Sequence, residues 1–103
     1  MSSKSKQKGY RFESEFTKKL NENGIPAVRV PMSGSLGGVL KDDVIIGSIE
    51  HPIARCELKY RENLSVQLWE WLEGADYLCI KRNHKKPLVV MELDQFMELF
   101  KSN

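Results

Sequence analysis

Residues 53–60, with the sequence IARCELKY, decide the predicted fold of this chain. Side chains of two kinds alternate along the stretch, which is typical of a β-strand with one covered face. The strand divides its side chains into two sets: Ala54, Cys56, Leu58 and Tyr60 on one face, and Ile53, Arg55, Glu57 and Lys59 on the other. An exposed antiparallel strand shows the same alternation, so the pattern predicts a strand without establishing a site.

A second acidic residue lies upstream, with thirteen residues between Asp43 and Glu57. Asp43 opens a Val-Ile-Ile-rich strand predicted over residues 43–49. If the two strands pair as a hairpin, the head groups of Asp43, Glu57 and Lys59 converge at one end of the sheet. Two carboxylates that close together repel unless a cation lies between them, and oxygen ligands, including the Leu58 carbonyl, suit Mg²⁺. The spacing therefore predicts a metal site, and the lysine indicates chemistry on a phosphate.

Composition is that of an ordinary soluble globular protein, with 41% hydrophobic and 29% charged residues among 103. No apolar run approaches the roughly 20 residues of a membrane span, and no signal-peptide pattern opens the chain. Cys56 and Cys79 lie in apolar, strand-like runs, so we expect reduced core cysteines and a cytoplasmic location in a bacterial, archaeal or phage-infected cell. His51 and His84 lie far apart in turn-like contexts, which argues against a zinc site.

The net charge of +2 is unevenly distributed, because residues 1–11 hold four cations and no acid: Lys4, Lys6, Lys8 and Arg11. A start rich in serine and lysine is usually a solvated tail, but it is also what a phosphate-contacting arm looks like. We therefore expect a basic flexible arm over residues 1–9 and a single domain over residues 10–103.

The first helix is predicted from Tyr10 to about Asn23, with an apolar stripe formed by Phe12, Phe16 and Leu20. Gly24 is placed to end it as the C′ residue. Glu13 is the acid closest to the buried face, where it could also simply lie at the edge of the core with its carboxylate in water.

The later elements are predicted from the same signals. Strands are expected over 27–31, 43–49, 53–60, 77–82 and 88–92, a loop over 32–41, and helices over 66–72 and from Asp94, with Ser65 and Asp94 as N-caps. The predicted order is α-β-β-β-α-β-β-α. The helix over 66–72 carries two apolar stripes, so one of them is either an oligomer contact or is covered within a small core.

These residues resemble the PD-(D/E)XK nuclease superfamily, and within it the Holliday junction resolvases of archaea and their viral relatives. The similarity covers roughly the first 80 residues. Its motifs are, in order, Lys8-Gly9 with Glu13, Gly24, Val28-Arg29-Val30, Ser33-Gly34-Ser35, Asp43-Val44 and Glu57-Leu58-Lys59. The ordered set is more specific than Asp…Glu-x-Lys alone. Asp42 stands where the superfamily's motif has proline.

The resemblance implies an α/β (α+β) fold with a restriction-endonuclease-like core, in which helices flank a central mixed five-stranded sheet. It implies Mg²⁺, with Mn²⁺ as an alternative, bound by Asp43 and Glu57 with Glu13 assisting. Lys59 would orient or polarise the attacking water, which cleaves a phosphodiester bond and leaves a 5′-phosphate. We expect phosphate or DNA contacts from Lys4, Lys6, Lys8, Arg11, Arg29, Ser33, Ser35, Lys41 and Gln67.

Three functions fit this pattern. The first is a metal-dependent endonuclease, a Holliday junction resolvase that cuts branched DNA as a homodimer, since a four-way junction is itself nearly two-fold symmetric. The second is a nicking or restriction-type enzyme that cuts duplex DNA, because a fold does not fix its substrate. The third is a non-catalytic module that binds nucleic acid or another protein, in which the charged face of residues 53–60 is merely solvated.

Overall fold

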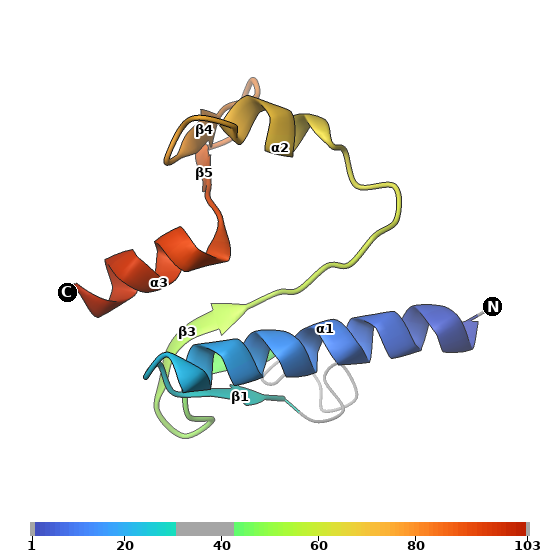
Figure 1. Cartoon of the computed structure of the whole chain (residues 1–103), viewed down its shortest axis with the longest axis vertical. Helices are drawn as coiled ribbons and strands as arrows, with labels where there is room; N and C mark the ends of the chain where they lie inside the picture. The colour runs from blue at the N-terminus through green and yellow to red at the C-terminus, as the bar shows by residue number, and fades with distance from the viewer. Residues whose placement is uncertain (1, 31–42, 103) are drawn as a thin grey trace. The chain divides into compact units, whose positions relative to one another are not determined.

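The computed structural model describes residues 2–30 and 43–102, with side chains from residue 9 onward (Figure 1). The predicted loop over 32–41 and Asp42 lie outside these ranges. The chain divides into two compact units, residues 1–62 and 63–103. The expectation of a single domain over residues 10–103 therefore stays a prediction, and each unit is described by itself.

Helix α1 of the first unit spans Ser2–Glu22, so it begins before the predicted start at Tyr10. Residues 2–9, expected as a flexible arm, continue the helix, although Gly9 is a weak helix former. The end of the helix is as predicted. Gly24 adopts φ 80°, and the Ile25 N–H donates to the Leu20 carbonyl at 2.9 Å. This is a Schellman ending, and it buries both of those apolar side chains.

Three strands of the first unit form an antiparallel sheet in the order β1-β2-β3. Their bounds are Ala27–Arg29 for β1, Val44–Gly47 for β2 and Pro52–Cys56 for β3. The predicted hairpin between β2 and β3 is confirmed. Its register shifts between Ile46 and Gly47, where Gly47 adopts φ 100°. A Cβ at that position would lie 2.7 Å from the backbone oxygen of His51, so this bend requires glycine.

The core of the first unit surrounds the middle strand. Val44, Ile45 and Ile46 are all buried, although consecutive residues of a strand point to opposite faces. Both faces of β2 are therefore covered, as its apolar sequence predicts for a central strand. Helix α1 packs against β1 (Figure 1).

The second unit contains two helices and a β-hairpin. Its elements are α2 (Gln67–Leu72), β4 (Leu78–Ile80), β5 (Leu88–Val90) and α3 (Leu93–Lys101). The predicted pairing of β4 with β5 is confirmed, with Ile80 opposite Leu88. Helix α2 begins at Gln67 with Val66 as its N-cap, one residue later than predicted, and Ser65 Oγ accepts a hydrogen bond from the Gln67 N–H at 3.2 Å.

Some predicted details of the second unit are wrong. Helix α3 begins one residue early, with Glu92 rather than Asp94 before its first turn, and Glu92 makes no side-chain cap hydrogen bond. Cys79 is exposed rather than part of the core, because it lies on the outward face of a two-stranded hairpin; neither it nor Cys56 takes part in a disulfide.

The mixed α and β class is confirmed, but the single five-stranded mixed sheet is not. The described strands form one three-stranded and one two-stranded sheet, and every pairing is antiparallel. Alternation in sequence predicts strands but not their partners, because every strand offers the same backbone donors and acceptors. None of the helices in the described ranges is long and apolar enough to span a membrane.

Each apolar stripe of α2 carries one exposed tryptophan. Trp71 is 56% exposed on the stripe of Leu68, and Trp69 is 55% exposed on the stripe of Leu72, which is itself buried. The second unit by itself therefore leaves both tryptophans uncovered, and both alternatives, an oligomer contact and cover within a small core, stay predictions.

Candidate active site

Asp43 is fixed at the junction of all three strands of the first unit. Its backbone N–H donates to the Cys56 carbonyl at 3.1 Å, and its carbonyl accepts from the Val30 N–H at 3.0 Å. Its side-chain Oδ2 accepts from the Leu58 N–H at 2.7 Å. The bonds to Cys56 and Leu58 bracket Glu57, so the two predicted metal-binding acids are neighbours at the end of the sheet.

Glu57 and Lys59 lie together just beyond β3. Lys59 Nζ is 3.1 Å from Glu57 Oε2, and the two side chains are 55% (Glu57) and 59% (Lys59) exposed. An ion pair this exposed to water contributes little stability, so it separates readily when another charged group arrives. The predicted strand over residues 53–60 is wrong in its extent, because β3 ends at Cys56. The alternation of exposure continues to Lys59, with Glu57 and Lys59 exposed while Cys56 and Leu58 are partly buried, but Tyr60 is 51% exposed.

Glu13 has a different partner from the one predicted. Its Oε1 accepts from Arg29 Nε at 3.4 Å and from the Arg29 terminal nitrogen at 3.2 Å, in a pair whose side chains are 22% (Glu13) and 29% (Arg29) exposed. The guanidinium of Arg29 also lies 4.0 Å from the centre of the Tyr10 ring. The sequence interpretation missed Tyr10, although residues three apart on a helix are neighbours and Tyr10 precedes Glu13 by three.

The register of the sheet explains why Glu13 and Glu57 do not meet. Arg29 is opposite Val44, and Val44 is opposite Cys56, so these three side chains share one face of the sheet. Glu13 reaches that face through Arg29, whereas Glu57, next to Cys56, points to the other face. Within residues 2–30 and 43–102, no three acidic, histidine or cysteine side chains are placed to hold a metal ion.

Aromatic contacts hold the segment after β3 against α1. The Phe12 ring meets the Tyr60 ring edge-on with centroids 5.9 Å apart, and it meets the Phe16 ring at 6.0 Å. Such pairs add about 0.5–1.5 kcal/mol beyond the area they bury. The contact ties the residue next to Lys59 to the helix that carries Glu13, which limits how far the segment can move.

The other residues predicted to bind DNA are not gathered by the described structure. Arg11 and Gln67 are exposed, the latter on α2 in the second unit. Lys4, Lys6 and Lys8 lie on α1, but their side chains are outside the described part of the chain, as are the whole residues Ser33, Ser35 and Lys41.

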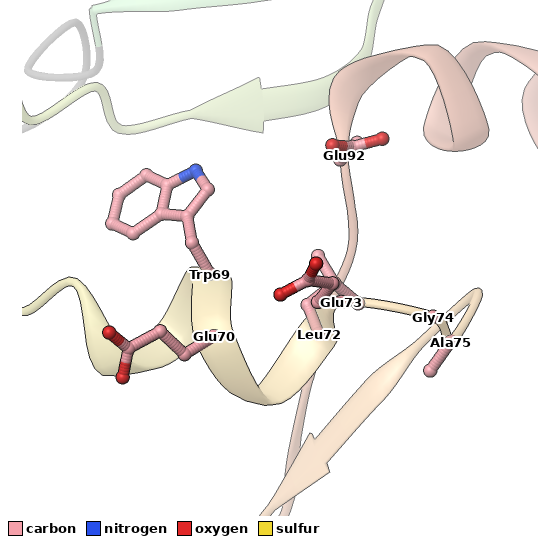
Figure 2. Close-up of a pocket in the computed structure, with 7 residues that line it drawn as sticks. All are labelled: Trp69, Glu70, Leu72, Glu73, Gly74, Ala75 and Glu92. Carbon is pink, nitrogen blue, oxygen red and sulfur yellow. The ribbon is translucent and has the colours of Figure 1, made fainter.

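A hollow in the second unit is lined by a tryptophan and three acids (Figure 2). Its residues are Trp69, Glu70, Leu72, Glu73, Gly74, Ala75 and Glu92. Figure 2 shows the carboxylates of Glu70, Glu73 and Glu92 pointing in different directions. They do not converge on one point, so this hollow is not a second metal site.

Comparison with protein families gives one match. The family model described as archaeal Holliday junction resolvase matches residues 4–101, which is nearly the whole chain. Comparison with curated proteins and with solved structures gives no significant match.

Proposed function

Since this chain belongs to the archaeal Holliday junction resolvase family, we propose that it is a nuclease that cuts four-way DNA junctions at Asp43, Glu57 and Lys59. The observation that carries the proposal is the clamping of Asp43 to the backbone on both sides of Glu57. Asp43 directly precedes the buried strand β2, and rigid elements hold reacting groups more accurately than loops do.

The donor atoms at this point suit Mg²⁺, with Mn²⁺ as an alternative. Asp43 and Glu57 would hold the ion, with the Leu58 carbonyl as a third oxygen ligand, and hard oxygen donors are what these cations prefer. Each carboxylate has a second oxygen besides the one engaged with Leu58 or Lys59. When bound, the ion makes a water ligand more acidic and offsets the negative charge that develops on the phosphate.

Lys59 has two roles in this proposal. Without the cation it neutralises Glu57 at 3.1 Å, which offsets the repulsion between two neighbouring acids. When Glu57 turns to a metal ion, the Lys59 ammonium is released toward the phosphate, where it orients the attacking water and stabilises the transition state.

Arg29 and Glu13 support the reaction from the other face of the sheet. A DNA phosphate competes with Glu13 for the Arg29 guanidinium, because both present oxygens to the same planar group of donors. Because Glu13 lies on the face of the sheet opposite Glu57, its role in this proposal is to hold the Arg29 guanidinium in place until a phosphate takes it over. Glu13 thus assists by positioning Arg29 rather than by binding the ion.

The protein acts as a homodimer in this proposal, because resolving a junction requires two cuts placed symmetrically. Paired cuts in opposing strands of one junction, made without dissociation, are the expected result. A supercoiled plasmid with a cruciform tests this, because paired cuts convert it to linear DNA whereas single cuts by a monomer give nicked circles. Nicked circles without linear DNA would contradict the dimer.

The decisive test of the substrate compares a four-way junction with its linear duplex in Mg²⁺. We expect cleavage of the junction and little cleavage of the duplex. Equal cleavage of both would make the protein a nicking or restriction-type enzyme. Binding of the junction without cleavage in either Mg²⁺ or Mn²⁺ would make it a non-catalytic module.

A further inference from the structure

Positive charge in the second unit is concentrated in one place. Of its five lysine and arginine residues, four lie within residues 81–86: Lys81, Arg82, Lys85 and Lys86. Its six acids all lie before residue 77 or after residue 91. The unit as a whole is therefore close to neutral, while the connection between β4 and β5 is strongly basic. We name residues 80–88 the basic hairpin.

The turn of the basic hairpin brings its cations together. The Lys85 N–H donates to the Arg82 carbonyl at 3.1 Å, and His84 adopts φ 64°, as the third residue of a type II turn does. Arg82 and Lys85 are thus the two ends of one tight turn, and Lys81 and Lys86 flank them. All four side chains are exposed, and none forms an ion pair with a carboxylate of the described residues.

The same residues surround a shallow hollow with an apolar floor. It is lined by Ile80, Lys81, Arg82, Lys85, Lys86 and Leu88. Ile80 and Leu88 are paired across the hairpin, and Leu88 is 61% exposed. An apolar floor with a cationic rim matches a sugar–phosphate backbone, in which apolar sugar edges alternate with negatively charged phosphates.

We infer that the basic hairpin binds the DNA backbone as a second, sequence-independent contact, separate from the residues of the cleavage site. The inference rests on the proposed function, which supplies DNA as the partner. Lysine and arginine contacts to phosphates provide affinity and register without reading sequence. The hairpin therefore acts on binding to junction and duplex alike, and the choice between them is made elsewhere.

The test measures DNA affinity against salt concentration for Lys85→Gln/Lys86→Gln, with Mg²⁺ replaced by Ca²⁺ to prevent cleavage. Each lost phosphate contact should reduce the slope of log K against log salt by about 0.9 and weaken binding roughly tenfold at 0.1 M salt. Lys101→Gln is the control: it removes one positive charge from an exposed site of the same unit, where the double variant removes two. We expect Lys101→Gln to change the slope of log K against log salt by less than about 0.5, which is about half the change expected for one lost contact.

Two further measurements separate charge from folding. His84→Gly relieves the left-handed residue without changing the lysines and arginines, and should keep wild-type affinity. In the unmodified protein, DNA should protect Lys81, Lys85 and Lys86 from acetylation, detected by mass spectrometry, and leave Lys101 reactive.

The outcomes distinguish the hairpin from the proposed function. An unchanged slope in the double variant, or an equal change in Lys101→Gln, overturns the hairpin contact while junction cleavage by the wild type still supports the nuclease. Failure of the wild type to bind any DNA overturns both. Protection of the three hairpin lysines together with the reduced slope supports the inference.

Discussion

The two units of this chain differ in how much they bury and in what they present. Among the described residues, the first unit buries six large apolar side chains and the second buries two, Leu72 and Met97. The first unit holds its acids at fixed points beside a buried strand, whereas the second carries its cations on an exposed turn. Bond cleavage requires accurate positions, but contact with a repeating phosphate backbone does not. The difference suggests that chemistry belongs to the first unit and general affinity to the second.

The largest expected effect is in the first unit. Asp43→Asn keeps an oxygen that can accept the Leu58 N–H but removes a negative charge from the proposed metal site. Junction cleavage should fall about a thousandfold, which corresponds to the several kcal/mol a metal ion supplies. Titration with Mn²⁺ should show weaker binding in the same variant. Unchanged Mn²⁺ affinity would place the metal elsewhere.

The next largest expected effect is a difference between the two units in how much a core substitution lowers the free energy of unfolding. Ile46→Ala removes a side chain that is 0% exposed on the central strand, and should lower the free energy of unfolding by about 2–5 kcal/mol. Met97→Ala, at 4% exposed, should fall at the low end of that range, because a sparse core relaxes around a cavity more easily. Urea unfolding followed by circular dichroism measures both. An equal or larger loss in Met97→Ala would contradict the comparison.

Two glycines with positive φ give a smaller contrast. Gly47→Ala places a Cβ 2.7 Å from the His51 oxygen, whereas Gly74→Ala in the second unit has open space at φ 81°. The left-handed conformation alone costs about 1–2 kcal/mol, and Gly47→Ala should exceed that because the backbone must also shift. Gly47→Ala should therefore lower the melting temperature more than Gly74→Ala does. Equal melting temperatures would mean that the backbone at the bend after Ile46 can shift without cost.

The smallest effect concerns Tyr10. Tyr10→Leu removes the ring that lies 4.0 Å from the Arg29 guanidinium, at a position that is 60% exposed. The free energy of unfolding should fall by about 0.5–1 kcal/mol, as for other exposed cation–π contacts. Tyr10→Phe retains the ring and should stay close to wild type in the same urea experiment. Equal losses in both variants would assign the effect to the hydroxyl instead.

The sequence predicted the strands and the neighbouring acids well, because the signals are local. Alternation over residues 53–60 and the apolar run from Val44 identified two strands, and their pairing brought Asp43 next to Glu57. The end of α1 was equally clear, since Gly24 followed by Pro26 is a strong stop signal. These features depend on residues close together in the chain.

What the sequence did not predict depends on partners far apart in the chain. Glu13 was expected at a metal ion, but sixteen residues later Arg29 provides a closer cation on the same face of the sheet. The position of Glu13 on a helical wheel shows which side of the helix it lies on, but not which residue contacts that side. The division of the five strands between two sheets could not be predicted for the same reason. The residue pattern of a strand identifies it as a strand, but it does not show which other strand it pairs with.

The acids at the end of β3 are proposed to carry the chemistry, and the most direct test is to compare how fast two variants cleave a four-way junction. The variants are Glu57→Gln, which changes the site, and Glu50→Gln, which is the control. Glu50 is exposed in the turn before β3, so its substitution removes the same charge away from Asp43. In Mg²⁺ under single-turnover conditions, Glu57→Gln should cut about a thousandfold more slowly, and Glu50→Gln should cut like wild type. Cleavage by Glu57→Gln at the wild-type rate would contradict the account.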